Sequence, residues 1–139
     1  GSFLAEAAKS LAPAAVRAVH AVALEDFAPP AGSTYELVWA QWVLGYVDDE
    51  ALITLLRRCA ALLAPGGCIV VKESVTRGGG GPTAGYYDAS DGSTTRSEER
   101  FCQCFASAGL RVLSAQLQTG FPPELFPVVM FALVARSQA

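Results

Sequence analysis

The sequence predicts a domain of the α/β class, for three reasons. Apolar runs typical of strands alternate with segments that have the periodicity of helices, which is the pattern of a mostly parallel sheet. Near the C-terminus, residues 110–116 and 128–134 have the character of two strands with no helix between them, so we expect an antiparallel strand at one edge. The apolar fraction, 52% of 139 residues, is ample for the core of one domain.

The earlier part of the sheet is predicted from three short segments. Residues 19–24 and 37–39 are strand candidates, the first followed by an acidic and proline-rich turn. Residues 68–72 form a continuous apolar run, which favours a strand that is covered on both faces.

Two helices are predicted between these strands. Asp48 or Asp49 can cap a helix that continues to residue 63, where the proline and glycines of 65–67 would stop it. A second helix is expected over residues 95–107. Residues 76–93, which separate the third strand from this helix, are predicted to be a long loop, and loops of this length are usually functional or disordered.

Composition argues against nucleic acid as a partner, against a membrane span and against a metal site. The net charge of −3 argues against a nucleic-acid-binding surface, which is normally basic. No apolar run reaches the ~18 residues of a membrane span. The four cysteines and the single histidine make a poor metal-ligand set, so we expect no metal and free, mostly buried thiols in a reducing compartment. We expect a monomer in the cytoplasm, the nucleus or both.

The end of the second predicted strand indicates a pocket. The apolar run there ends abruptly in Gln41 and Trp42. In open α/β sheets, ligands bind at the carboxyl ends of the strands. A buried Gln41 would need hydrogen-bond partners, and Trp42 lies in a turn rather than in mid-strand, so the pair favours a binding pocket over a chance core position.

A second candidate site lies in the predicted long loop. Asp88, Asp91 and Ser93 follow two tyrosines there. On pattern alone a solvated turn is the better interpretation, and calcium is a weak alternative because the further oxygen ligands of an EF-hand loop are absent. Carboxylates beside aromatic rings also suit the recognition of an ammonium group.

Taken together, the segments resemble one family. They are FLAEAAK (3–9), LEDF (24–27), WAQWVLGY (39–46), LRRC (56–59), IVVKE (69–73), DxxDxSxxR (88–96), SAGL (107–110) and PxE (122–124). In this order they resemble the alpha-N-terminal protein methyltransferases, which use S-adenosylmethionine to methylate the terminal amine of proteins that begin X-Pro-Lys. The resemblance implies the class I methyltransferase fold, a Rossmann-like sheet with an antiparallel last strand.

The resemblance also implies roles for single residues. Leu24 and Glu25 would contact the adenine, although the family more often has Gln at the position of Glu25, and Gln41 would lie beside the methionine part of the cofactor. The residues implied to surround the peptide are Trp42, Tyr46, Ser74, Asp88, Asp91 and Ser93. Tyr46 replaces a histidine that is often credited with deprotonating the amine. That replacement leaves Asp91 as the better candidate for the catalytic proton acceptor, with Asp88 as its partner.

The family's glycine-rich turn after the first strand, and the acidic residue that ends the second, have no counterpart before residue 24. In the family's strand order, 3-2-1-4-5-7-6, the first two strands would separate residues 19–24 from residues 35–40. We therefore expect residues 1–139 to be a partial methyltransferase domain that lacks the first two strands and does not bind the cofactor alone.

Two other functions remain open at this point. A small-molecule methyltransferase of the same fold would not need Asp88 and Asp91. A noncatalytic interaction module would fit the absent glycine turn.

Overall fold

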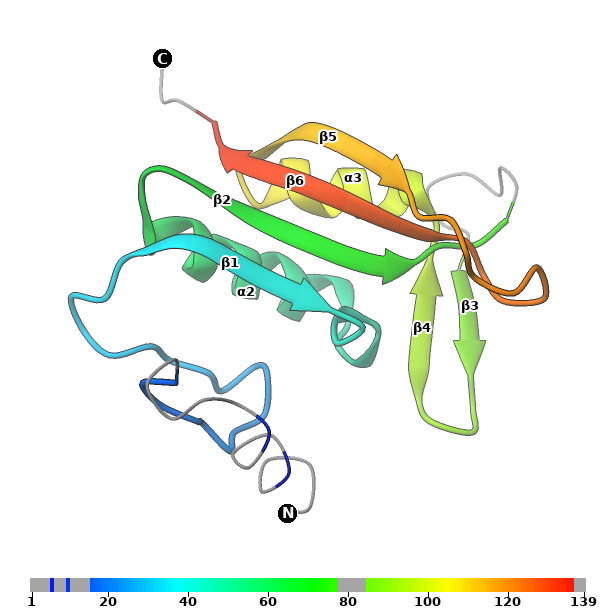
Figure 1. Ribbon diagram of the computed structural model, residues 1–139, viewed down its shortest axis with the longest axis horizontal. Helices are drawn as coiled ribbons and strands as arrows, with labels where there is room; N and C mark the ends of the chain where they lie inside the picture. Colours follow the sequence, from blue (N-terminus) through cyan, green and yellow to red (C-terminus); the bar gives the residue numbers. More distant parts are fainter. Residues whose placement is uncertain (1–5, 7–9, 11–15, 78–84, 137–139) are drawn as a thin grey trace.

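The computed structural model describes residues 6, 10, 16–77 and 85–136 (Figure 1). The predicted α/β class is confirmed. The elements, of which η2 is a 3-10 helix, are β1 (Tyr35–Gln41), η2 (Leu44–Tyr46), α2 (Asp49–Ala61), β2 (Leu63–Ser74), β3 (Gly85–Asp88), β4 (Ser93–Arg96), α3 (Glu98–Ser107), β5 (Leu110–Leu117) and β6 (Val128–Ala135).

The main sheet has the strand order β1-β2-β6-β5. β1 and β2 are parallel, and β6 is antiparallel to both of its neighbours. The sheet therefore matches the 4-5-7-6 part of the expected order. The prediction of an antiparallel strand at the edge was wrong, because β6 lies inside the sheet, where its unbroken apolar sequence suits a strand that is paired on both sides.

Residues 19–24 do not form the predicted strand. Val19 and Val22 are 50% and 55% exposed, and the segment ends in a turn in which the Asp26 N–H donates to the Ala23 carbonyl at 3.1 Å. In the described part of the chain, no strand lies beside this segment. A lone strand would leave its backbone groups unpaired, so apolar composition alone does not produce one.

The first predicted helix is confirmed as α2, with Asp48 as its cap: Asp48 Oδ1 accepts the Ala51 N–H at 2.8 Å. The helix ends at Ala61, and residues 65–67 lie within β2 instead of terminating a helix. A Cβ at Gly67 would lie 2.9 Å from the Tyr35 carbonyl oxygen, so glycine there lets β2 pair closely with β1.

The long loop and the second helix were predicted with the wrong boundaries. β3 and β4 pair as an antiparallel hairpin, and residues 78–84, which begin with four glycines, lie outside the described residues. Gly92 turns the hairpin with φ 75°. α3 begins at Glu98 rather than residue 95, because the Ser97 side chain caps it by accepting the Arg100 N–H at 3.1 Å.

Helices α2 and α3 pack on the same face of the sheet (Figure 1). Their leucines and phenylalanines enclose the core with the inward side chains of β2 and β6. On the opposite face, Leu37 and Trp39 of β1 are half-exposed. In β2, which was predicted to be covered on both faces, Ile69 and Val71 are buried, whereas Val70 is only half-buried. Neither described helix is long and apolar enough to cross a membrane. The thiols are free as expected, although only Cys104 is fully buried.

Candidate active site

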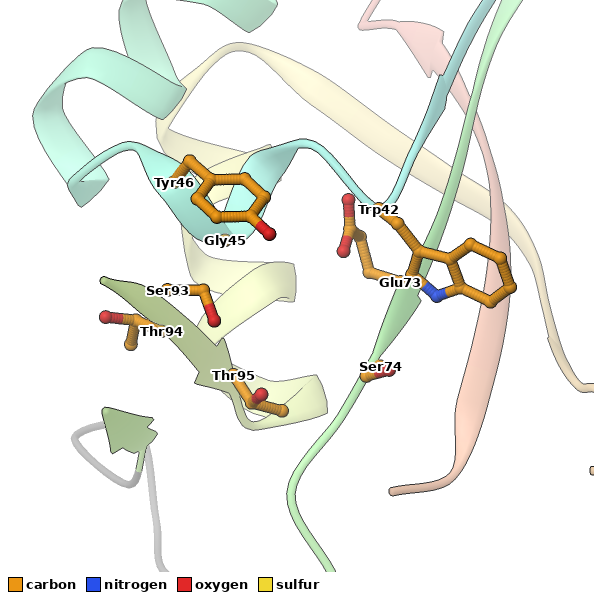
Figure 2. Close-up of a pocket in the computed structure, with 8 residues that line it drawn as sticks. All are labelled: Trp42, Gly45, Tyr46, Glu73, Ser74, Ser93, Thr94 and Thr95. Atoms are coloured by element: carbon orange, nitrogen blue, oxygen red, sulfur yellow. The ribbon is translucent and has the colours of Figure 1, made fainter. Parts of the chain in front are cut away.

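A cleft of about 220 Å³ opens where β1 and β2 reach their carboxyl ends, facing the β3–β4 hairpin. Parallel strands bring their carboxyl ends to one edge, which is where α/β proteins bind ligands. Figure 2 shows Tyr46 and the β4 residues on one side and Trp42, Glu73 and Ser74 on the other. The lining residues are Trp42, Gly45, Tyr46, Glu73, Ser74, Ser93, Thr94 and Thr95.

Trp42 turns the chain sharply at the end of β1. Its φ of 51° is in the left-handed region, which is unusual for a residue other than glycine and is often found at functional sites. Its N–H donates to the Lys72 carbonyl at 3.2 Å, and its indole meets the Phe121 ring edge-on at 6.2 Å. Gln41 does not line the cleft. Its Oε1 accepts the indole N–H of Trp39 at 3.1 Å.

Glu73 is an acid buried in the wall of the cleft, with 5% of its surface exposed. Its Oε1 accepts the Val43 N–H at 2.9 Å and the Leu44 N–H at 3.0 Å. Burial raises the pKa of Glu73, and the two backbone hydrogen bonds oppose that shift only in part. Sequence reasoning assigned Glu73 no role. The available signal was a carboxylate following directly on an apolar strand.

The hairpin meets η2 through a hydrogen bond between two predicted site residues. The Tyr46 hydroxyl donates to Asp91 Oδ2 at 3.3 Å, and the Ser93 N–H donates to Asp91 Oδ1 at 2.9 Å. Hydrogen bonds from Ser93 lower the pKa of Asp91, and the charge of Asp91 raises the pKa of Tyr46. Asp88 has a different environment, because its Oδ1 accepts the N–H and the hydroxyl of Ser90 within the hairpin turn.

Arg96 fixes the hairpin to the rest of the domain. Its side chain is 4% exposed, and it donates to Asp49 Oδ1 at 2.6 Å, to the Leu44 carbonyl at 2.7 Å and to the Val47 carbonyl. Burial would raise the pKa of Asp49, but the hydrogen bonds and charges of Arg96 and Arg100 outweigh it, so the pKa is lowered. One guanidinium thus joins β4, η2 and α2.

Glycine is required where η2 meets β4. A Cβ at Gly45 would lie 3.3 Å from the Thr94 carbonyl oxygen, closer than most side-chain contacts. The absence of a side chain lets the strand approach the 3-10 helix, and this approach closes one wall of the cleft.

The residues predicted for the adenine are separated from each other. Leu24 lines an apolar cavity of about 500 Å³ next to the cleft, and Tyr46 borders both. Glu25 instead faces the start of α2, and its carbonyl accepts a hydrogen bond from Arg58 at 2.8 Å. The remaining residues of the apolar cavity are His20, Val22, Phe27 and Val43.

The structure therefore divides the predicted site residues into two groups. Trp42, Tyr46, Ser74 and Ser93 line one cleft. Those that do not line this cleft are Leu24, Glu25, Gln41, Asp88 and Asp91, of which Asp91 accepts a hydrogen bond from the cleft residue Tyr46. Glu73 and Arg96 were not among the predicted site residues, although both contact the backbone that shapes the cleft.

A comparison with family models decides the family. Residues 1–134 match the model described as AdoMet-dependent proline di-methyltransferase. The chain belongs to this family. That membership confirms the resemblance found in the sequence, and the strand order of the main sheet is that of the class I methyltransferase fold.

Relatives of this methyltransferase family are named for N-terminal methylation. The chain is 46% identical over 110 residues to alpha N-terminal protein methyltransferase 1 of Caenorhabditis elegans, covering 79% of this chain and 45% of the relative. It is 34% identical over 110 residues to N-terminal Xaa-Pro-Lys N-methyltransferase 1-B of Xenopus laevis, covering 79% of this chain and 47% of the relative.

A solved structure agrees with this assignment. A SAM-dependent methyltransferase of Leishmania major superposes with a TM-score of 0.71 at 31% identity, over 79% of this chain and 42% of the other. The chain thus spans less than half the length of each of these three proteins.

Proposed function

We propose that this chain forms the substrate-facing part of an S-adenosylmethionine-dependent methyltransferase that acts on the α-amino group of proteins beginning X-Pro-Lys. The observation that carries the proposal is the hydrogen bond of Asp91 with Tyr46, which lines a cleft together with Trp42, Ser74 and Ser93. Membership of the family and the names of the relatives support it.

The chemistry of the cleft suits an amine nucleophile. An α-amino group has a pKa of ~8, so deprotonation to the neutral form, which is the nucleophile, costs little free energy at neutral pH. The lowered pKa of Asp91 keeps its carboxylate ionised, which suits it to hold the ammonium group. The same low pKa makes Asp91 a weak base, so a proton that it accepts from the amine would pass on to solvent. Asp88 pairs with Ser93 in the same hairpin. Its charge would add to the attraction for the cationic N-terminus of the peptide and for a basic residue at the third position of the peptide.

The described residues fit one side of the cofactor. Leu24 and Val43 offer an apolar surface beside Tyr46 that suits an adenine ring, and Gln41 ends the strand that leads to the cleft. The cofactor, when bound, supplies an electrophilic methyl group on a sulfonium. The residues of this chain would then orient the amine for in-line attack and exclude water, which is the main task in such a displacement.

The wider proposal concerns partners and location. Peptides with basic residues near the N-terminus suit the negative charge of the hairpin, whereas the net charge of −3 disfavours nucleic acid. We propose a monomer that acts in the cytoplasm, the nucleus or both, without membrane attachment. The free thiols are in keeping with a reducing compartment.

A peptide panel tests the function. Protein expressed from the complete gene would be incubated with S-adenosylmethionine and peptides that begin X-Pro-Lys, with Nα-acetylated copies as matched controls. We expect mass increases of one or more methyl groups on the free peptides only, located by fragmentation to the α-amine. Methylation of neither set would contradict the proposal and favour the small-molecule methyltransferase or the noncatalytic module.

A further inference from the structure

The turn between β1 and η2 carries both sides of the cleft. Trp42 lies at its start and Tyr46 at its end, four residues later. The backbone between them is bent into the left-handed region at Trp42 and then begins a short 3-10 helix. A shift in this turn would move the indole relative to the Tyr46–Asp91 pair.

Two backbone N–H groups in this turn have their partner in a single side chain. The first N–H groups of a helix have no acceptor within the helix itself, and burying them without a partner costs about 1–3 kcal/mol each. Here Val43 and Leu44 both donate to Glu73 Oε1, at 2.9 and 3.0 Å. Leu44 is fully buried, so water cannot replace the carboxylate there.

We propose that Glu73 is a positioning residue for methyl transfer: one carboxylate oxygen fixes the β1–η2 turn and so sets the place of Trp42 relative to Tyr46. The role rests on the proposed function, but the geometry that it fixes is present in the chain itself. Figure 2 shows the Glu73 carboxylate between the backbone of Trp42 and the 3-10 helix.

The two backbone hydrogen bonds support the positioning role, because one oxygen of a side chain that is only 5% exposed accepts both of them. An amide oxygen could accept the same two hydrogen bonds. The rival role is proton acceptor, since Glu73 lines the cleft. A positioning role needs an acceptor atom at the position of Oε1, whereas a proton acceptor needs the charge.

Three variants separate these roles. Glu73→Gln keeps the side-chain length and a hydrogen-bond acceptor oxygen. Glu73→Met keeps the side-chain length but has no strong acceptor. Glu73→Asp keeps the charge on a side chain that is shorter by one methylene. All are made in a Trp39→Phe background, so that Trp42 is the only tryptophan within residues 1–139, the chain used for fluorescence. Trp39 is half-exposed and does not line the cleft, but its indole N–H donates to Gln41 Oε1, so the Trp39→Phe protein itself is the reference for all three variants.

The readouts are the emission and acrylamide quenching of Trp42, followed by kinetics on an X-Pro-Lys peptide. We expect Glu73→Gln to leave the quenching constant unchanged and turnover within about threefold. Glu73→Met and Glu73→Asp should both change the quenching and lower kcat/KM about tenfold or more, which corresponds to ~1.4 kcal/mol. Should Met prevent folding, Glu73→Asp carries the same test.

Two results would overturn the proposal. Unchanged Trp42 quenching in both Glu73→Asp and Glu73→Met would show that the turn does not depend on Oε1. Loss of turnover in Glu73→Gln with unchanged quenching would assign Glu73 to proton transfer instead. The fluorescence result stands without activity, so a failure of the proposed function is distinguishable from a failure of the positioning role.

Discussion

Arg96 is predicted to contribute more to stability than Arg100, which contacts the same carboxylate from a more exposed position, and Arg96→Met tests this. The substitution keeps much of the side-chain length but removes the donors to Asp49 and to the Leu44 and Val47 carbonyls. Leu44 is fully buried and Val47 nearly so, so their carbonyls would lose a partner that water cannot easily replace.

The magnitude follows from these contacts. Breaking a buried ion pair by removing one partner costs about 3–5 kcal/mol. Asp49 retains Arg100 as a second partner, which moderates the ionic part, while each orphaned carbonyl adds about 1–3 kcal/mol. We therefore expect the free energy of unfolding to fall by about 3 kcal/mol or more, a large share of the ~5–15 kcal/mol of a typical domain.

Urea denaturation followed by circular dichroism measures the loss, with Arg100→Met as the matched control. Arg100 contacts the same carboxylate, but its side chain is 36% exposed. Exposed ion pairs contribute about 0–1 kcal/mol, so the control should change stability by no more than that. Equal losses in the two variants, or a loss below about 1 kcal/mol for Arg96→Met, would refute the reasoning.

Three further predictions follow from single contacts. Gly67→Ala should lower the free energy of unfolding by about 1–3 kcal/mol, because the new Cβ would press on the Tyr35 carbonyl; an unchanged denaturation midpoint would contradict the close β1–β2 pairing. The raised pKa of Glu73 means that the folded state holds its proton to higher pH than the unfolded state, so the parent loses stability as pH rises from the unfolded pKa through the folded pKa. Glu73→Gln should gain stability relative to the parent over that interval, and parallel stability–pH curves would exclude the effect. Tyr46→Phe removes the hydroxyl that donates to Asp91 and should lower kcat/KM about 2- to 12-fold with unchanged unfolding free energy, whereas a destabilised variant would assign the pair a structural role.

The sequence predicted best the elements whose signals are local. The face of leucines and the Asp48 cap predict α2, and apolar runs predict β1, β2, β5 and β6. Residues 19–24 have a strand-like composition but no strand in the described structure, because a strand depends on a partner that composition does not reveal.

The β3–β4 hairpin shows where local signals compete. Aspartate, serine and glycine suggested a solvated loop, yet Asp91-Gly92 between two β-prone pairs, Tyr86-Tyr87 and Thr94-Thr95, is a recognised hairpin signal. Recognising it would also have moved the start of the helix to the Ser97 cap.

The part of the candidate site that depends on residues close in sequence was predicted, and the part that depends on long-range contacts was not. Trp42 and Tyr46 lie a few residues apart, so the sequence places them together, and family resemblance added the hairpin. Glu73 and Arg96 act through backbone groups about 29 and 49–52 residues away in sequence, and no spacing pattern encodes such contacts. Their importance becomes visible only when the strand ends and the hairpin meet.

Methylation by the Asp91→Asn variant tests the central claim most directly, since Asp91 is the proposed proton acceptor and is hydrogen-bonded to Tyr46 of the cleft. The measurement is the rate of α-amine methylation of an X-Pro-Lys peptide by protein expressed from the complete gene, alongside calorimetric titration with S-adenosylmethionine. Loss of a general acid–base residue typically lowers the rate about 10²- to 10⁴-fold, and we expect a loss of that order with unchanged cofactor affinity. Turnover equal to that of the parent would contradict the assignment of the cleft as the site of amine deprotonation.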